Sequence, residues 1–202
     1  MAEIASPEAL RTLYRPPSER AVKKQLDHLD VHCRKYVSLS PFLVLASTDA
    51  EGRVDASPRG GEPGFVKAPD ERTLLIPDSP GNNRLDSLHN LLGRPGVGLL
   101  FLIPGVDETL RVNGIAALRT DEALLDLCAS ERRRPPLVIA IEVRETYLHC
   151  AKALMRSKLW DPAARRDRLA LPSMGRMLKE QIGLAGEPES DAVMRERYLK
   201  DL

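Results

Sequence analysis

Six short apolar segments between residues 42 and 148, separated by brief turns, most strongly constrain how this chain folds. In order they read FLVLAST, RVDASPR, RTLLIP, VGLLFLIP, ETLRVNGIAAL and PLVIAIEVRETYL. Five are rich in aliphatic residues, and RVDASPR alternates apolar with polar residues. All but the last end near Gly, Pro or Asp, the pattern of a strand followed by a turn. Only short helices fit between them, which favours antiparallel pairing over a parallel sheet. The sequence therefore predicts a mainly β fold, a six-stranded antiparallel barrel with flanking helices.

The two ends of the chain carry helical patterns. Near the start, SPEALRTLY offers Ser6 as a helix N-cap and Pro7 at the first helical position. The segment AVKKQLDHLDVHCRKYV follows, and its apolar residues are spaced as one stripe of a single helix. These residues are Val22, Leu26, Leu29, Cys33 and Tyr36.

The chain length of 202 residues is enough for one sizeable core. We predict a single domain over residues 1–202, with a helical segment at 1–40, the barrel at 42–148 and a helical C-terminal segment at 149–202. The last segment is helical in pattern, and the final helix has Ser190 and Asp191 near its start, where either suits an N-cap.

The composition argues against several classes of protein, among them nucleic-acid-binding, membrane-spanning and exported proteins. Lys and Arg number 30 and Asp and Glu 29, a balance without the basic excess of a nucleic-acid-binding protein. No apolar run approaches the ~20 residues of a membrane span. The first twenty residues carry charges and prolines where a signal peptide has an apolar core. The three cysteines form no C-x-x-C pair, so we expect a cytoplasmic protein with reduced thiols and no metal site.

The segment IPDSPGNNRLDSLHNLL, residues 76–92, ends a strand and begins a helix. The first N–H groups of a helix lack internal partners and carry partial positive charge. Two interpretations follow. An Asn caps the helix and Arg84 is solvated, or Arg84 and the helix N–H groups bind an anion such as a phosphate.

Two strands present alternating polar residues, since successive side chains in a strand point to opposite faces. In RVDASPR the polar face consists of Asp55, Ser57 and Arg59, and the apolar face of Val54, Ala56 and Pro58. In TLRVNGIAAL, Arg111 and Asn113 are predicted to point away from the core. The core-facing residues are predicted to be Leu110, Val112, Ala116 and Leu118. These polar rows are either solvated outer faces or parts of a ligand site. In the second case a nearby Gly, as in SPRGG or Gly114 of NGIA, would let the backbone approach the ligand.

Taken in order, the segments ASPRG, LLIPDSPGNNRLDSL, GLLFLIPGVDETLRVNGIA and HCAKALMRSKLWDP resemble the pyridoxamine 5'-phosphate oxidase-like superfamily of FMN-binding split barrels. The resemblance covers roughly residues 40–162 and is strongest to the bacterial branch of FMN-dependent enzymes with unassigned substrates. It implies an FMN-binding split barrel that forms a homodimer, with two FMN molecules between the subunits. It also implies an oxidoreductase that passes electrons from a reduced donor to a small substrate.

The resemblance also implies which residues hold the cofactor. The SPRG strand places Ser57 and Arg59 near the phosphate or the ribityl chain. The following turn borders the flavin ring and then the phosphate, and its implied residues are Asp78, Ser79, Asn82, Asn83 and Arg84. The later segments, which the other subunit can supply, contribute Arg111, Lys152, Arg156, Ser157 and Trp160. Lys152 and Arg156 are four residues apart and share a helix face, while Trp160 either stacks on the flavin or anchors its segment.

The sequence departs from pyridoxamine phosphate oxidases in two places. The strand RVDASPRGG has few basic residues, and no C-terminal Trp and Arg signature is present. We therefore expect flavin binding rather than vitamin B6 oxidation, and name no catalytic residue because the flavin ring performs the redox step. The alternatives are a non-catalytic flavin-binding protein, F420 in place of FMN, and haem with His149 as its first candidate ligand.

Overall fold

The computed structural model describes residues 3–200. Its contacts divide the chain into two compact units, the first ending at Arg156 and the second beginning at Ser157. Each unit is described by itself, and the single-domain organisation stays a prediction. None of the helices in the described residues is both long and apolar enough to cross a membrane.

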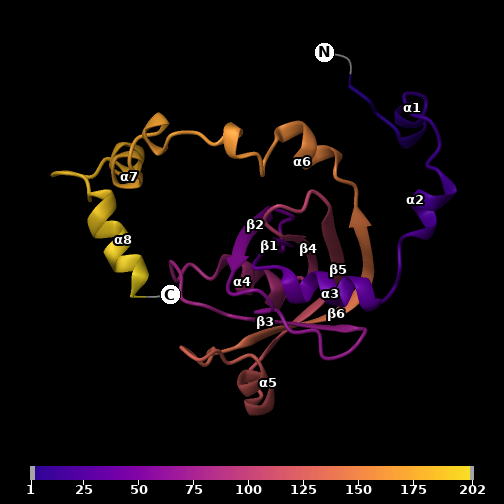
Figure 1. Cartoon of the computed structure of the whole chain (residues 1–202), viewed down its shortest axis with the longest axis horizontal. Coiled ribbons are helices and arrows are strands. Elements are labelled where there is room, and N and C mark those ends of the chain that lie inside the picture. Colours follow the sequence, from indigo (N-terminus) through magenta and orange to yellow (C-terminus); the bar gives the residue numbers. More distant parts are fainter. Residues whose placement is uncertain (1–2, 201–202) are drawn as a thin grey trace. The chain divides into compact units, whose positions relative to one another are not determined.

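The first unit is a curled six-stranded sheet with helices at its flanks (Figure 1). The spatial order is β2-β1-β4-β5-β6-β3, and every neighbouring pair is antiparallel. The predicted split-barrel fold and all six predicted strands are therefore confirmed. The strands are β1 (Phe42–Thr48), β2 (Val54–Gly60), β3 (Thr73–Pro77), β4 (Gly96–Leu102), β5 (Thr109–Arg119) and β6 (Val138–His149).

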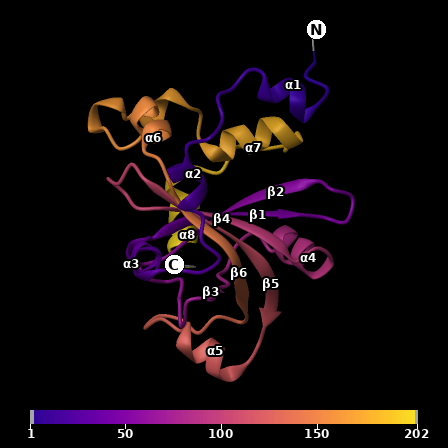
Figure 2. The same ribbon diagram turned by 90° about the vertical axis from the view of Figure 1, so that its right-hand side faces the viewer.

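Short helices precede, interrupt and follow the sheet, and one of them, α4, lies beside the β1–β2 hairpin (Figure 2). Ser6 and Ser190 cap their helices through their side chains as predicted. In chain order the helices are α1 (Pro7–Arg11), α2 (Glu19–Lys23), α3 (Val31–Leu39), α4 (Asp86–Gly93), α5 (Glu122–Leu127), α6 (Lys152–Ser157), α7 (Met174–Ile182) and α8 (Asp191–Leu199).

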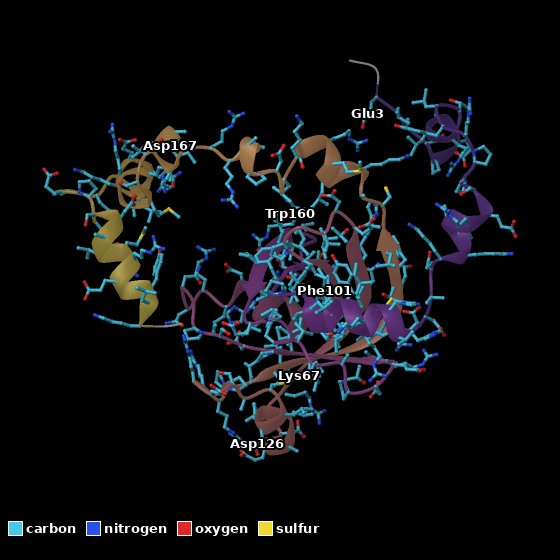
Figure 3. The ribbon with its side chains drawn as sticks, viewed as in Figure 1. Glu3, Lys67, Phe101, Asp126, Trp160 and Asp167 are labelled. Carbon is cyan, nitrogen blue, oxygen red and sulfur yellow. The ribbon has the colours of Figure 1, made fainter. Side chains whose placement is uncertain are left out.

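The core lies on the inner face of the sheet. Leu43 of β1 is in register with Phe101 of β4, which is in register with Leu110 of β5, and all three are fully buried. Phe101 lies in the middle of the barrel (Figure 3). Helix α3 closes this core with Cys33 and Val37. Burial of this many aliphatic side chains is the main stabilising contribution to the fold.

The predicted single helix over residues 21–37 is wrong. Helix α2 ends at Lys23, and residues 24–30 instead run as a strap along β6. The Leu26 N–H donates to the Thr146 carbonyl at 2.9 Å, and the Thr146 N–H donates back at 2.8 Å. Because β3 pairs only with the first half of β6, the backbone of Thr146 needs another partner, and buried backbone groups are rarely left unpaired. Val22 consequently lies outside the core, 59% exposed.

Strand β6 contains a bulge. Asn113 of β5 is opposite Glu145, but the next residue, Gly114, is opposite Val143, so Arg144 is an extra residue in β6. A Cβ on Gly114 would lie 2.4 Å from the carbonyl oxygen of Glu142. The interpretation that this glycine admits a ligand is therefore wrong, because the neighbouring strand occupies the space.

We predict that Gly114→Ala destabilises the protein by about 1–3 kcal/mol or more, because the added methyl group overlaps backbone that cannot easily move. Urea unfolding followed by circular dichroism measures the change. The control is Gly96→Ala in β4, where a Cβ meets nothing within 4 Å. Equal stabilities of the two variants would contradict this account of the bulge.

Candidate functional site

The polar row of β2 faces the inner side of the sheet. Asp55, Ser57 and Arg59 are half-buried, whereas the apolar residues that alternate with them are exposed, with Val54 at 77%. The alternation is confirmed, but the interpretation of this row as a solvated outer face is wrong. The row lies at the edge of the sheet where α4 packs against β1 and β2.

Arg59 is the most constrained cation of this region. Its Nη1 donates to Asp78 Oδ1 at 3.1 Å, and the two side chains are only 19% and 15% exposed. Its Nε is buried, and among residues 3–200 it is the one buried side-chain polar atom without a hydrogen-bond partner. An unsatisfied buried N–H is costly and uncommon, so Arg59 combines positive charge with a spare donor.

The segment before α4 is shaped by two residues with positive φ. Asn83 has φ 56° and Leu85 has φ 60°, a conformation that is strained for a leucine. Asn82 Oδ1 accepts the Arg84 N–H at 3.0 Å and so closes a local turn. Helix α4 begins at Asp86 and has no side-chain cap. The interpretation of an Asn-capped helix is therefore wrong, and the first-turn N–H groups have no capping side chain.

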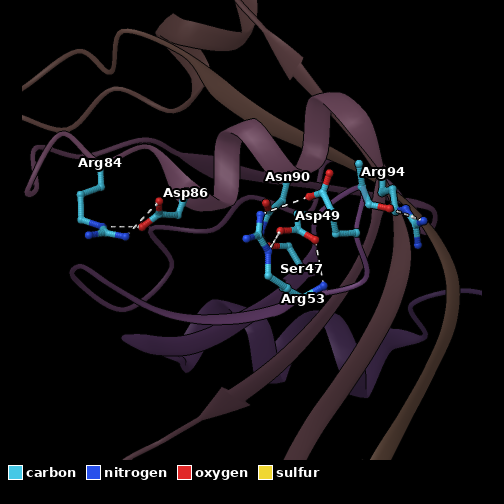
Figure 4. A network of polar contacts seen from close by, with 9 residues as sticks. Ser47, Asp49, Arg53, Arg84, Asp86, Asn90 and Arg94 are labelled. Atoms are coloured by element: carbon cyan, nitrogen blue, oxygen red, sulfur yellow. Dashed lines mark hydrogen bonds and ion pairs between the residues drawn. The ribbon is translucent and has the colours of Figure 1, made fainter.

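Arg84 is exposed and already forms an ion pair. Its Nε donates to Asp86 Oδ2 at 2.7 Å, and the side chains are 70% and 50% exposed (Figure 4). The hydrogen bond to Asp86, and then its charge, raise the pKa of Arg84. An exposed pair contributes little to stability, so a ligand anion can compete for this guanidinium.

A polar network fastens α4 to the β1–β2 hairpin (Figure 4). Ser87 donates to Asp55 Oδ2 at 2.7 Å, and Asn90 donates to Ser47 Oγ at 3.0 Å. At the end of the helix, Arg94 donates to a hairpin carbonyl at 2.6 Å. Sequence reasoning missed Ser47, Ser87 and Asn90. The three-residue spacing of Ser87 and Asn90 in α4, which puts them on one helix face, is the signal that could have shown them.

Arg111 and Asn113 lie on the outer face of the sheet. Arg59 is in register with Leu43, Phe101 and Leu110 across four strands, and Arg111 follows Leu110, so its side chain points to the opposite face. The core-facing residues predicted for β5 are confirmed. Within one chain, the two predicted polar rows therefore do not converge.

The remaining predicted residues lie at the surface or in the second unit. Ser79 is exposed, and so are Lys152 and Arg156 of α6, which form no ion pair within residues 3–200. Ser157 and the half-buried Trp160 belong to the second unit. His149 ends β6. The described part of the chain holds no group of three or more His, Cys, Asp or Glu side chains that could bind a metal.

The curled six-stranded antiparallel sheet with its flanking helices is the fold of the split-barrel proteins. The sequence model of the pyridoxamine 5'-phosphate oxidase family matches residues 29–150, more than half of the chain. The chain belongs to this family.

Solved structures that resemble this chain share little sequence with it. A variant of HupZ from Group A Streptococcus is 15% identical, with 60% of this chain and 99% of that chain covered and a TM-score of 0.50. An FMN-binding protein from Syntrophomonas wolfei is 11% identical over 58% and 83% of the two chains, with a TM-score of 0.47. HutZ, the haem storage protein of Vibrio cholerae, is 12% identical over 59% and 94%, with a TM-score of 0.40. No curated protein matches the sequence.

We predict that Asp78→Asn lowers the free energy of unfolding by about 1–3 kcal/mol, because it removes the only carboxylate that pairs with the largely buried Arg59 among the described residues. Asp86→Asn, which disrupts the exposed pair with Arg84, is the matched control and should change stability little. Urea unfolding of both variants checks this. A loss as large in the control as in Asp78→Asn would show that burial is not what distinguishes the two pairs.

Proposed function

We propose that the chain is an FMN-binding oxidoreductase that acts on a small molecule. The proposal rests on one observation about Arg59. Its Nε–H is buried without a hydrogen-bond partner, beside the ion pair that the same side chain forms with Asp78. Arginine is the residue best suited to bind phosphate or carbohydrate oxygens with a fixed fork of donors. The family match supports a cofactor of this type.

The residues around Arg59 fit the polar half of FMN. Arg84 and the first-turn N–H groups of α4 lie at the end of the segment that starts with Asp78, and a helix N-terminus favours an anion. Asn82 and Asn83 shape this segment, and Ser57 shares the half-buried face of β2 with Arg59. In the proposed site Arg59 and Arg84 bind the phosphate or the ribityl chain, and Asp78 holds Arg59 in place.

A second copy of the chain completes the proposed site. Arg59 and Arg111 lie on opposite faces of one sheet, so a single ligand that contacts both needs two subunits. The outer face of β1, β2 and β4 carries apolar side chains next to Arg111, and such a face is suited to pair with another copy. Arg111, Lys152, Arg156, Ser157 and Trp160 are the residues proposed for the partner's side.

The bound FMN supplies the electron-transfer chemistry, and the protein binds and orients it. The proposed enzyme takes electrons from a reduced donor and passes them to a small substrate. It works in the cytoplasm, which agrees with three cysteines free of disulfides. Burial raises the pKa of the Cys33 thiol to about 11, so this thiol stays protonated and is no candidate nucleophile at neutral pH.

We predict that Arg59→Lys weakens FMN binding about tenfold, because lysine keeps the positive charge near Asp78 but lacks the Nε–H donor. Arg84→Ala should weaken it about ten- to a hundredfold. Fluorescence titration with FMN measures both. Arg53→Lys is the control, because Arg53 is 78% exposed and pairs with Asp49 at the hairpin turn.

Riboflavin, which lacks the phosphate, separates the possible contacts. If Arg59 binds the phosphate, Arg59→Lys leaves riboflavin affinity unchanged, whereas a contact to the ribityl chain weakens both ligands. Absorption spectra after dialysis against FMN, F420 and haem identify the cofactor. A protein that retains haem or F420 but not FMN would overturn the FMN assignment, and one that retains FMN without turnover would leave a flavin-binding protein.

A further inference from the structure

The outer face of β5 and β6 carries a block of polar side chains that the bulge creates. Because Arg144 is the extra residue, Glu145 and Tyr147 point outward next to Asn113 and Arg111, with which they are in register. All four are half-buried, and the residues that separate them along the strands are buried. A bulge commonly re-aims side chains beside a binding site.

The carboxylate of Glu145 fixes the orientation of the Asn113 amide. Asn113 Nδ2 donates to Glu145 Oε1 at 2.9 Å, and Gln25 of the strap donates to the other oxygen at 2.6 Å. An ionised carboxylate only accepts hydrogen bonds, so the NH₂ group of Asn113 must face it. The amide oxygen then faces β4, 3.3 Å from where a Cβ on Gly98 would lie. In the described part of the chain no donor reaches this oxygen.

Arg111 is held by an aromatic ring rather than by a carboxylate. Its guanidinium carbon lies 5.2 Å from the centroid of the Tyr147 ring. Lys24 of the strap is also 5.2 Å from this centroid and donates to the Leu148 carbonyl at 2.8 Å. No ion pair to Arg111 occurs within residues 3–200. Its N–H donors are therefore available on the same face as the Asn113 oxygen, about 7 Å further along the strand.

An apolar surface lies directly beside these two residues. Arg111 is in register with Leu100 and Asn113 with Gly98 in β4, and β1 continues both rows with small or aliphatic side chains. The surface consists of Val44, Ala46, Gly98 and Leu100. A flat ring can lie on it with one edge toward Arg111 and Asn113.

We propose that this outer face recognises the pyrimidine edge of the flavin ring. That edge carries an N–H group between two carbonyl groups. Asn113 offers an acceptor for the N–H, and Arg111 offers donors for a carbonyl beside it. Asn113 accepts the N3–H, and Arg111 donates to a ring carbonyl. The inference rests on the proposed function and adds the residues that select the ring.

Glu145 is a positioning residue in this arrangement, because it acts through Asn113. Arg111 also places positive charge at the pyrimidine edge, where reduction of a flavin concentrates negative charge, and charge near this position tunes the cofactor. Since Arg59 lies on the opposite face, the phosphate and the ring of one FMN are bound by different subunits.

The first test compares FMN with N3-methyl-FMN on the unaltered protein by fluorescence titration. We expect the methylated ligand to bind about tenfold more weakly, because it cannot donate to Asn113 and leaves that oxygen without a partner. Equal affinities would overturn the inference while leaving the proposed function intact. Failure of both flavins to bind would overturn the proposed function and this inference with it.

Variants then assign the effect to residues. Asn113→Leu, of similar size, should bind the two flavins equally, and Glu145→Gln should reduce the preference because its amide no longer fixes Asn113. Glu142→Gln is the matched control, since Glu142 is an exposed residue of β6 that pairs with Arg144, and it should retain the preference. Arg111→Gln should make the midpoint potential of bound FMN more negative. Discrimination that survives Asn113→Leu, or an unchanged potential, would contradict these assignments.

Discussion

The pairing of β5 with β6 is the interaction on which the rest of the structure depends. It is the longest ladder of the sheet, and it joins the β2-β1-β4 half to β3 and to the strap of residues 24–30. The bulge at Arg144 changes which residues of β6 face outward, and Gly114 makes the close approach possible. Without this irregularity, Glu145 and Tyr147 would point into the core, where a carboxylate is strongly disfavoured.

Because the bulge sits midway along β6, each half of the strand has a different partner on its outer edge. The first half pairs with β3, while the second half is left to the strap, whose Leu26 bridges Thr146. The strap thereby brings Lys24 and Gln25 to the outer polar block. A segment that sequence periodicity assigns to a helix is instead recruited to a strand edge, since free backbone groups there need partners.

Sequence alone predicted all six strands, because apolar residues run or alternate along each and turn residues bound most of them. It also predicted the inward residues of β5, whose alternation is regular. It could not predict the strap, because the three-residue spacing of Leu26 and Leu29 is that of a helix. The sequence could not predict the bulge either, since nothing in the segment EVRETY indicates an extra residue in the strand. For the candidate site, the sequence indicated which residues are polar but not which face they occupy, and this depends on register.

The proposed phosphate site draws its residues from several elements, and their charges bear on how it would bind an anion. Asp78 and Asp86 offset Arg59 and Arg84, and Asp55 lies close enough to influence Arg84. Within one chain, these two arginines and three aspartates leave this edge without an excess of positive charge. The carboxylates of Asp78 and Asp86 hold the two guanidinium groups in a defined arrangement. In the proposed dimer, cations from α6 and from the second copy would add positive charge at this edge, which would link anion binding to assembly.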